Sequence, residues 1–207
     1  MLESCEKHDE PVFIVVLQEI LSRIKEISGC QSCGIRLSKD GDFPFYIHEG
    51  LPDFFLKREN SLLVRDENDN IVYDQNYHPL LDCMCGNIIK SHFNPSFPFF
   101  SKKGSFWTNS TTLLISSLTE EQKKFIGPTR NLCNYSGYES VALIPLKTGT
   151  GVIGLVHLAD PRENMFTVER ITELEQVVEE SASMIEHADK ITEKLLKIDQ
   201  IISAARE

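Results

Sequence analysis

The fold is decided by residues 139–160, ESVALIPLKTGTGVIGLVHLAD. Two apolar runs, Val141–Leu146 and Val152–Ala159, are rich in β-branched residues and flank the glycine-containing loop Lys147–Gly151. Runs of strand length joined by residues that tolerate positive φ are typical of a β-hairpin. Both runs are apolar throughout, so we expect both faces of the hairpin to be covered. Pro145 lacks a backbone N–H and predicts a bulge or an unpaired position.

Helical patterns lie near both ends of the chain. A first helix is predicted from Pro11 to Gly29, and its apolar residues form a narrow seam, Phe13, Leu17, Ile20, Ile24 and Ile27. A last helix is predicted from Thr167 onward, with one stripe suited to covering the sheet, Ile171, Leu174, Val178, Ala182 and Ile185. A second stripe has heptad spacing: Val177, Ser181, Met184, Ala188, Ile191, Leu195, Ile198 and Ile202. Because this stripe runs longer than one domain can bury, we expect a dimer seam shared with the first helix. The alternative is a helix that folds back on its own domain.

Shorter elements follow from local signals. Thr119 and Gln122 have capping-box spacing and predict a helix start. The hydroxyl-rich segment Thr108–Ser117 is predicted to return as a strand. The remaining expected elements are strands at Cys33–Leu37 and Phe43–Ile47, a helix at Leu51–Arg58 and a helix within Leu80–Lys90.

An aromatic segment separates these elements. Its rings are Phe93, Phe97, Phe99, Phe100, Phe106 and Trp107, and prolines and a glycine interrupt it. It is too irregular for a helix or strand and too apolar for a solvated loop. Two compatible interpretations stay open: a lid packed over the sheet, or an aromatic wall for a flat ligand.

Bulk properties limit the classes of function. The 207 residues, 41% apolar, suit one domain with long flanking helices. A net charge of −10 without a basic stretch argues against nucleic-acid binding. No apolar run is long enough to span a membrane, and no signal peptide is evident. We therefore expect a cytoplasmic protein whose six cysteines are thiols.

Three strings carry a family resemblance. GYESVALIPLKTGTGVIGLVHLADPRENMFTVERITELE resembles the C-terminal half of a GAF domain. DCMCGNIIKSHFNPSFPFFSKKGSFWTNSTT and RNLCNYSGYES resemble the subtype found between PAS domains and histidine-kinase cores in microbial sensor proteins. The resemblance runs from about Pro11 to Ala188. It implies an α+β, PAS-related fold: a central antiparallel sheet of five or six strands, terminal helices on one face, and a pocket covered by loops and helices on the other. The expected organisation is a flexible N-terminus (1–10), a GAF domain (11–188) and a helical extension (189–207).

The resemblance also places thiols at the pocket. Cys83, Cys85 and Cys133 would flank it, similar to cysteines of the free methionine-(R)-sulfoxide reductases, where a thiolate attacks the sulfoxide and a second cysteine resolves the intermediate. That group has an acidic pair on its last strand, whereas His157 and Ala159 stand at the corresponding places here. Redox sensing through the thiols is therefore favoured over a thiol enzyme, which stays an alternative.

His157 shares one face of its strand with Leu155 and Ala159. If the reductase comparison holds, this face looks into the pocket, where an imidazole could ligate haem iron or a metal, or donate to an organic ligand. The alternative is a satisfied core histidine. Some sensor-kinase GAF domains hold haem, so haem is the leading candidate if a cofactor is bound.

Cys30 and Cys33 form a Cys-x-x-Cys pair after a helix C-terminus, where the helix dipole disfavours thiolate. The pair would need Cys83 and Cys85 to complete a zinc site. Their spacing is unusual for that purpose, so we expect no metal site.

Polar residues of the subtype strings either line the pocket or close backbone hydrogen bonds in loops, and both interpretations stay open. These residues are Trp107, Thr108, Asn109, Arg130, Asn131, Asn134 and Glu139. The predicted ligand-binding residues are Cys83, Cys85, Phe99, Phe106, Trp107, Asn109, Asn131, Cys133, Glu139 and His157.

The predicted function is a sensory or regulatory GAF domain. It would bind a small ligand or cofactor, or sense redox state, and transmit its state through a homodimer of the terminal helices to a histidine kinase or another signalling output protein. We expect neither nucleic acid nor membrane as a partner. The alternatives are a thiol-dependent redox enzyme and a structural dimerisation module without a ligand.

Overall fold

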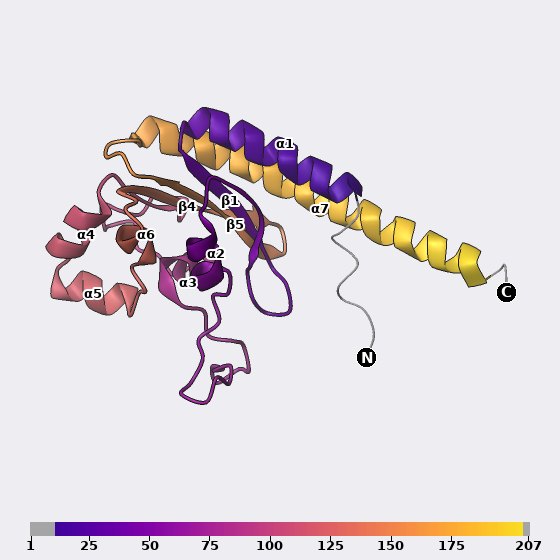
Figure 1. The fold of residues 1–207 in the computed structure, drawn as a ribbon, viewed down its shortest axis with the longest axis horizontal. Helices are drawn as coiled ribbons and strands as arrows, with labels where there is room; N and C mark the ends of the chain where they lie inside the picture. The colour runs from indigo at the N-terminus through magenta and orange to yellow at the C-terminus, as the bar shows by residue number, and fades with distance from the viewer. Residues whose placement is uncertain (1–10, 205–207) are drawn as a thin grey trace.

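The computed structural model describes residues 11–204 and has an α+β fold (Figure 1). Its antiparallel sheet has five strands in the order β2-β1-β5-β4-β3. The strands are β1 Ser32–Leu37, β2 Phe45–Glu49, β3 Phe106–Thr108, β4 Ser140–Thr148 and β5 Gly151–Asp160. The predicted fold class is therefore confirmed, while the prediction for residues 1–10 lies outside the described residues.

The predicted hairpin forms the centre of the sheet. β4 pairs with β5 along its whole length and places Leu143 opposite His157. Residues Ser140–Leu146 of β4 are buried, so both faces of this strand are covered. Pro145 stays in register with Leu155, and the register shifts one residue later, between Leu146 and Lys147. The irregularity therefore lies next to the proline rather than at it.

The terminal helices cover one face of the sheet. α1 Pro11–Ser28 and α7 Val168–Ala204 lie side by side on this face (Figure 1). The stripe predicted to cover the sheet is buried at 0–3% exposure: Ile171, Leu174, Val178, Ala182 and Ile185. This buried apolar surface fixes α7 to the sheet.

The apolar seam of α1 is used inside the chain. Phe13, Leu17, Ile20 and Ile24 are at most 3% exposed and belong to the core between the terminal helices and the sheet. The prediction that this seam joins a dimer interface is therefore wrong. Its heptad-like spacing reflects packing of α1 against α7 within one chain.

The second stripe of α7 divides into two parts. Val177, Ser181 and Ala188 are buried within the domain. Met184, Ile191, Leu195 and Ile198 are 47–52% exposed, on a helix that extends beyond α1 and the sheet (Figure 1). The side chain of Ile202 lies outside the described residues.

Five short helices lie on the opposite side of the sheet (Figure 1). They are α2 Asp53–Glu59, α3 Cys83–Ile89, α4 Thr111–Ser117, α5 Glu120–Ile126 and α6 Leu132–Tyr135. Together with the aromatic segment they enclose a second apolar core. The predicted capping box of Thr119 and Gln122 begins α5.

The predicted strand Thr108–Ser117 is wrong. Strand β3 ends at Thr108 and helix α4 follows. The Ser110 hydroxyl accepts a hydrogen bond from the Leu113 backbone N–H at 3.3 Å and caps this helix. An N-cap serine stabilises a helix start even where β-branched threonines follow it.

Candidate functional site

Three thiols from two distant segments meet around one cavity. Cys83 and Cys85 lie on α3 and Cys133 lies on α6, and all three line a cavity of about 80 Å³. Asp82 holds the segments together: it accepts from the Cys83 backbone N–H at 2.6 Å and from Arg130 Nε at 2.8 Å. This partly buried ion pair therefore brings the two cysteine-bearing segments to one place.

The backbone of both segments is unusual at this point. Cys83 has φ 64° and Asn131, which precedes α6, has φ 52°. Left-handed conformations of non-glycine residues cost free energy and cluster at functional sites. Five other non-glycine residues among residues 11–204 share this conformation, so it does not by itself single out the cavity.

The cavity is mainly apolar and partly open to solvent, since its lining residue Ile115 is exposed. The remaining lining residues are Met84, Phe106, Thr111, Leu114, Ile115, Leu118, Ile126, Thr129, Asn131, Leu132, Asn134, Val141 and Leu143. Pockets for drug-sized ligands have volumes of roughly 300–1,000 Å³. In this arrangement the cavity therefore has room only for a very small molecule.

Cys133 also contacts His157. The Cys133 Sγ lies 3.6 Å from His157 Nε2, and His157 is 1% exposed. Burial, assisted by the charge of Arg36, lowers the pKa of His157 from 6.5 to about 3. Burial also raises the pKa of the Cys133 thiol well above its usual value. Both groups are therefore uncharged at neutral pH.

The phenylalanine rings explain why His157 is so well desolvated. Its ring centroid lies 5.7 Å from that of Phe45 and 5.8 Å from that of Phe55. Its Nδ1 is buried without a hydrogen-bond partner. A proton on Nε2 leaves only an acceptor unpaired at Nδ1, so the tautomer that donates to Cys133 fits this environment.

Arg36 is a buried charged residue close to His157, and the sequence analysis did not identify it. It is fully buried, donates to the backbone carbonyls of Phe43, Glu59 and Asn60, and lies 3.7 Å from the ring centre of Phe45. Its Nε has no hydrogen-bond partner. The available signal was one charged residue inside the apolar strand sequence CGIRL.

The negative charge of the Glu59 carboxylate partly offsets the positive charge of Arg36. Its side chain is buried, and its Oε1 lies 3.6 Å from Arg130 NH1. Burial raises the pKa of Glu59, opposed by the charges of Arg130 and Arg36. The charged groups therefore alternate in sign from Arg36 through Glu59 and Arg130 to Asp82, beside the thiols.

The predicted site residues fall into two groups. Cys83, Cys85, Phe106, Asn131 and Cys133 line the cavity, and His157 reaches it through Cys133. The other four residues, Phe99, Trp107, Asn109 and Glu139, lie outside it.

These other residues have structural contacts. The Asn109 side chain accepts from the Phe166 N–H at 2.9 Å and donates to the Phe166 carbonyl at 2.8 Å. Glu139 accepts from Ser110 and Thr112 at the start of α4. Trp107 packs against the core between the sheet and the terminal helices α1 and α7. Asn109 and Glu139 thus close loop hydrogen bonds, which was one of the two interpretations left open.

The aromatic segment forms a packed lid. Phe99 lies 4.9 Å from Phe100 and 6.1 Å from Phe106, measured between ring centroids, and Phe97 packs on Phe125 at 5.4 Å. These rings fill the space between one another. Phe106 is the only aromatic ring of residues 11–204 that lines the thiol cavity. The segment therefore matches the lid interpretation in this arrangement.

Haem does not fit this site. The cavity has a volume of only about 80 Å³, and His157 is enclosed by phenylalanines with its Nε2 directed to Cys133. Cys30 and Cys33 lie in the core on the other face of the sheet from Cys85, so they cannot share a zinc ion with it. In the described part of the chain, no group of three His, Cys, Asp or Glu side chains could hold a metal ion.

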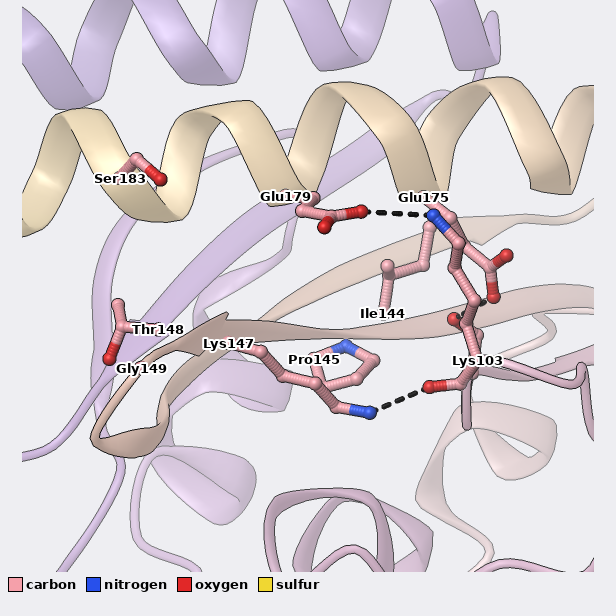
Figure 2. A pocket seen from close by; sticks show the side chains of 10 residues that line it. Lys103, Ile144, Pro145, Lys147, Thr148, Gly149, Glu175, Glu179 and Ser183 are labelled. Carbon is pink, nitrogen blue, oxygen red and sulfur yellow. Dashed lines mark hydrogen bonds and ion pairs between the residues drawn. The ribbon is translucent and has the colours of Figure 1, made fainter.

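The lid is connected to α7 (Figure 2). The hydroxyls of Ser101 and Ser105 both donate to Glu175 Oε1, the latter at 2.6 Å. One helical turn further, Lys103 pairs with Glu179 at 2.9 Å. We call residues 101–105 with Glu175 and Glu179 the lid latch. It attaches the lid segment directly to the long terminal helix.

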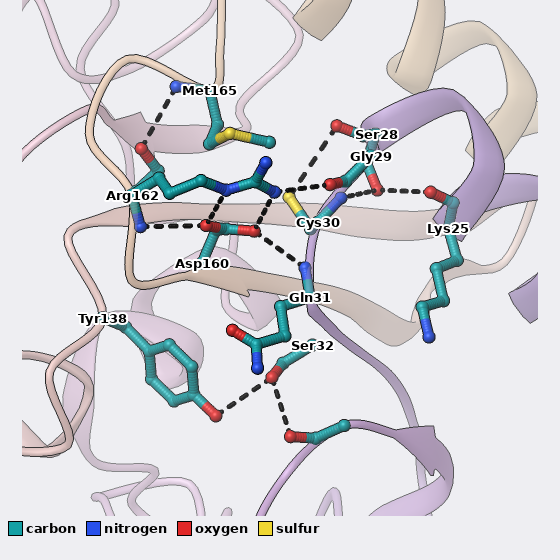
Figure 3. A network of polar contacts seen from close by, with 12 residues as sticks. Lys25, Ser28, Gly29, Cys30, Gln31, Ser32, Tyr138, Asp160, Arg162 and Met165 are labelled. Atoms are coloured by element: carbon teal, nitrogen blue, oxygen red, sulfur yellow. Dashed lines mark hydrogen bonds and ion pairs between the residues drawn. The ribbon is translucent and has the colours of Figure 1, made fainter.

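A second polar network fixes the ends of the sheet to the helical layer (Figure 3). The buried Asp160 carboxylate accepts from the Gln31 backbone N–H at 2.8 Å and from the Arg162 guanidinium at 2.7 and 2.8 Å. Arg162 also donates to the Gly29 carbonyl at 2.9 Å. The end of α1, the start of β1 and the end of β5 are therefore held at one point.

Comparison with known proteins shows the fold. No protein-family model and no curated protein matches the sequence. Among solved structures, the chain is similar to the second GAF domain of DevS from Mycobacterium smegmatis, with TM-score 0.54, 10% identity and coverage of 88% of this chain and 99% of that one. It is similar to a domain of a two-component sensor histidine kinase protein from Sinorhizobium meliloti 1021, with TM-score 0.52, 12% identity and coverage of 96% and 100%. A GAF domain/HD domain protein from Geobacter sulfurreducens gives TM-score 0.51, 18% identity and coverage of 86% and 95%.

At these identities the likeness establishes the fold, and the chain has the fold of GAF domains, as the sequence resemblance implied. None of the helices in residues 11–204 combines the length and apolar character needed to cross a membrane.

Proposed function

We propose that this chain with a GAF fold is a sensory module whose thiol-lined cavity binds a small ligand and whose α7 transmits the bound state. The observation that carries this proposal is the convergence of Cys83, Cys85 and Cys133 on one cavity beside the lid. The partly buried Asp82–Arg130 ion pair holds the two cysteine-bearing segments together at this cavity.

The ligand is expected to be small and weakly polar. The cavity volume of about 80 Å³ and its mainly aliphatic and sulfur lining disfavour a charged or bulky compound. A larger ligand would first have to displace Phe106 and Leu114, which belong to the lid and to α4. In that case the protein exists in two forms in equilibrium, and the form described here is the one without a ligand.

The lid latch supplies a route to α7. Phe106 lines the cavity, and the adjoining Ser105 donates to Glu175 on α7. A ligand that moves Phe106 also moves this donor. Ligand binding would then favour one position of α7 through its differential contacts with the two lid positions.

The bound state is passed on by a homodimer that forms through the C-terminal part of α7. Met184, Ile191, Leu195 and Ile198 repeat at spacings of seven, four and three and are about half exposed. Such a stripe on a projecting helix is suited to pairing with a second copy. The solved structures with this fold include a sensor histidine kinase domain, which supports a signalling output protein as the further partner.

Redox sensing is the second candidate, because three thiols lie at one cavity. Burial raises the pKa of Cys83, Cys85 and Cys133, so few of these thiols are ionised at neutral pH. Oxidation proceeds through the thiolate, so direct oxidation of these thiols is slow in the form described here. The same argument disfavours the thiol enzyme, since neutral Cys133 and His157 do not form a thiolate–imidazolium pair.

A fragment screen by thermal shift tests the ligand proposal. Val141→Phe and Cys133→Leu each fill the cavity, and Val15→Phe on the exposed face of α1 is the matched control. A fragment present at about 100 times its Kd stabilises the protein by about 2.7 kcal/mol. We expect this stabilisation in the wild type and the control and its loss in both filled variants. Equal shifts in all four proteins, or none in any of them, would contradict the proposal.

A further inference from the structure

A larger cleft lies at the edge of the sheet, away from the thiol cavity (Figure 2). It has a volume of about 510 Å³ and lies between α7, the hairpin end of β4 and the lid latch. β3 pairs with β4 only as far as Leu143, so the edge of β4 from Ile144 onward has no neighbouring strand among the described residues. The missing strand leaves this corner open to a ligand. Its volume falls within the range of about 300–1,000 Å³ that small-molecule sites occupy.

Glu175 contributes a buried carboxylate to this cleft. It is 7% exposed, and its Oε1 accepts from the hydroxyls of Ser101 and Ser105. Within residues 11–204, no cationic side chain forms an ion pair with it, because the neighbouring Lys103 pairs with Glu179 instead. Burying a carboxylate without a cation is costly, so a positively charged group is the expected complement.

Lys147 contributes the opposite charge. Its ammonium donates to the Lys103 carbonyl at 2.6 Å and lies 5.5 Å from the ring centre of Phe93. In the described part of the chain it has no carboxylate partner. Pro145 supplies apolar surface on the same side of β4 as the Lys147 ammonium, whereas Ile144 points to α7 on the other side, as Figure 2 shows. The cleft thus has one carboxylate that no cation contacts at ion-pair distance, although the charge of Lys103 acts on it, one ammonium without a carboxylate partner, and apolar surface beside the ammonium.

We propose that this cleft binds a small zwitterion with an apolar body, of the free α-amino acid type. The ligand lies across the open edge of β4: its ammonium complements Glu175, its carboxylate complements Lys147, and its side chain lies against Pro145. Among the described residues, the exposed Lys103–Glu179 pair is the one ion pair at the cleft, and such pairs contribute little stability, so it can rearrange at low cost.

This site differs from the thiol cavity in both place and ligand chemistry. A ligand bound here contacts the lid latch directly, because Glu175 holds Ser101 and Ser105. Occupancy would therefore strengthen the attachment of the lid to α7 and oppose its displacement from the thiol cavity. The proposal stands whether or not the thiol cavity binds a ligand.

Isothermal titration calorimetry tests the proposal with L-leucine, L-isoleucine, L-methionine and L-phenylalanine. Two half-ligands, 3-methylbutylamine and 4-methylpentanoate, each keep the leucine side chain and one of its charges. We expect at least one amino acid to bind with Kd below about 10 mM. Each half-ligand should bind at least about tenfold more weakly than that amino acid, since hydrogen bonds to charged groups contribute about 1.5–3 kcal/mol.

Two variants locate the binding. Glu175→Gln keeps an acceptor for both serine hydroxyls and removes the negative charge. Lys147→Gln removes the positive charge at the mouth of the cleft. Each should weaken binding about tenfold or more, whereas Glu173→Gln on the exposed face of α7 should leave it unchanged. Absence of binding by all four amino acids, or equal binding by the half-ligands, overturns the proposal. Binding that survives both variants but is lost in Val141→Phe also overturns it and assigns the amino acid to the thiol cavity.

Discussion

The Cys133 sulfur and the His157 imidazole, from α6 and the central strand β5, lie 3.6 Å apart, and neither is charged at neutral pH. In a catalytic Cys–His pair the histidine takes the proton and the thiolate attacks. Here burial opposes both charges, so the proton stays within a neutral hydrogen bond. The contact therefore joins two neutral side chains beside the cavity and does not activate Cys133 as a nucleophile.

The buried imidazole makes stability depend on pH. The pKa of His157 is about 3 in the folded protein against 6.5 when exposed. Between these values the unfolded chain binds the extra proton, so stability rises with pH through this window and levels off above it. Lowering the pH from about 7 to about 5 should cost the wild type about 2 kcal/mol through this residue, a loss that His157→Phe should not show.

Urea unfolding followed by circular dichroism at both pH values measures this difference. Arg36 and Cys133 are the charged and titratable groups nearest His157, and both remain in the variant. The matched control substitutes the exposed His48 by Asn and is measured at the same two pH values. Identical pH dependence in wild type and His157→Phe would show that His157 is not buried as described.

The thiols should be slow to alkylate in the native state. Burial raises the pKa of Cys30 from 9.0 to about 11, and it raises that of Cys85 as well. At about pH 8 such a pKa leaves about a thousandth of the Cys30 thiol ionised, against about a tenth at 9.0. Peptide-resolved mass spectrometry after iodoacetamide treatment should show slow labelling of Cys30 and Cys85 and fast labelling in urea. Rapid native labelling of either residue would place it at the surface.

The central hairpin could be predicted from sequence because both of its strands are continuous apolar runs around a glycine loop. Val141–Leu146 and Val152–Ala159 lie within β4 and β5. The helix at Thr111 was missed because its threonines favour strands locally, whereas one hydrogen bond from the Leu113 N–H to Ser110 decides the structure.

The site was predictable only where the residue type carries its own chemistry. Cysteines and a histidine attract notice in any position. Arg36 and Glu175 gain their importance from burial, and burial is a property of the fold. Glu175 follows Leu174 and lies one turn from Ile171 and Val178, so its place on the buried face was the available signal. The seam of α1 was misassigned because its pattern is the same whether the partner helix belongs to the same chain or to another.

Arg36 should be essential for stability. Arg36→Met leaves three carbonyls without their donor and leaves Glu59 with Arg130 as its remaining compensating charge. Removing one partner of a buried charge network costs about 3–5 kcal/mol. Chemical denaturation should show a loss of this size, and Arg65→Met on the exposed turn should change stability by less than about 0.5 kcal/mol.

The double variant Arg36→Met, Glu59→Gln separates charge compensation from packing. Because Glu59 is no longer charged, the double variant should be less destabilised than the sum of the two single variants, by about 1 kcal/mol. Strict additivity would mean that the two charges do not interact.

The exposed end of α7 should mediate dimerisation. Ile191→Asp with Leu195→Asp introduces charge into the proposed seam, and burying unpaired charges between helices is unfavourable. Sedimentation equilibrium should give a dimer for the wild type and a monomer for this variant. Lys194→Asp on the same helix, an exposed residue outside the stripe, is the control and should stay dimeric. A monomeric wild type at tens of micromolar would exclude the proposed output.

Diffraction from crystals of the protein pressurised with xenon tests the cavity most directly. Xenon enters dry apolar cavities and marks their position without changing their chemistry. The account predicts one xenon atom between Cys85, Cys133 and Val141, beneath Phe106. Electron density showing side chains packed through this space, with xenon absent from it, would contradict the account.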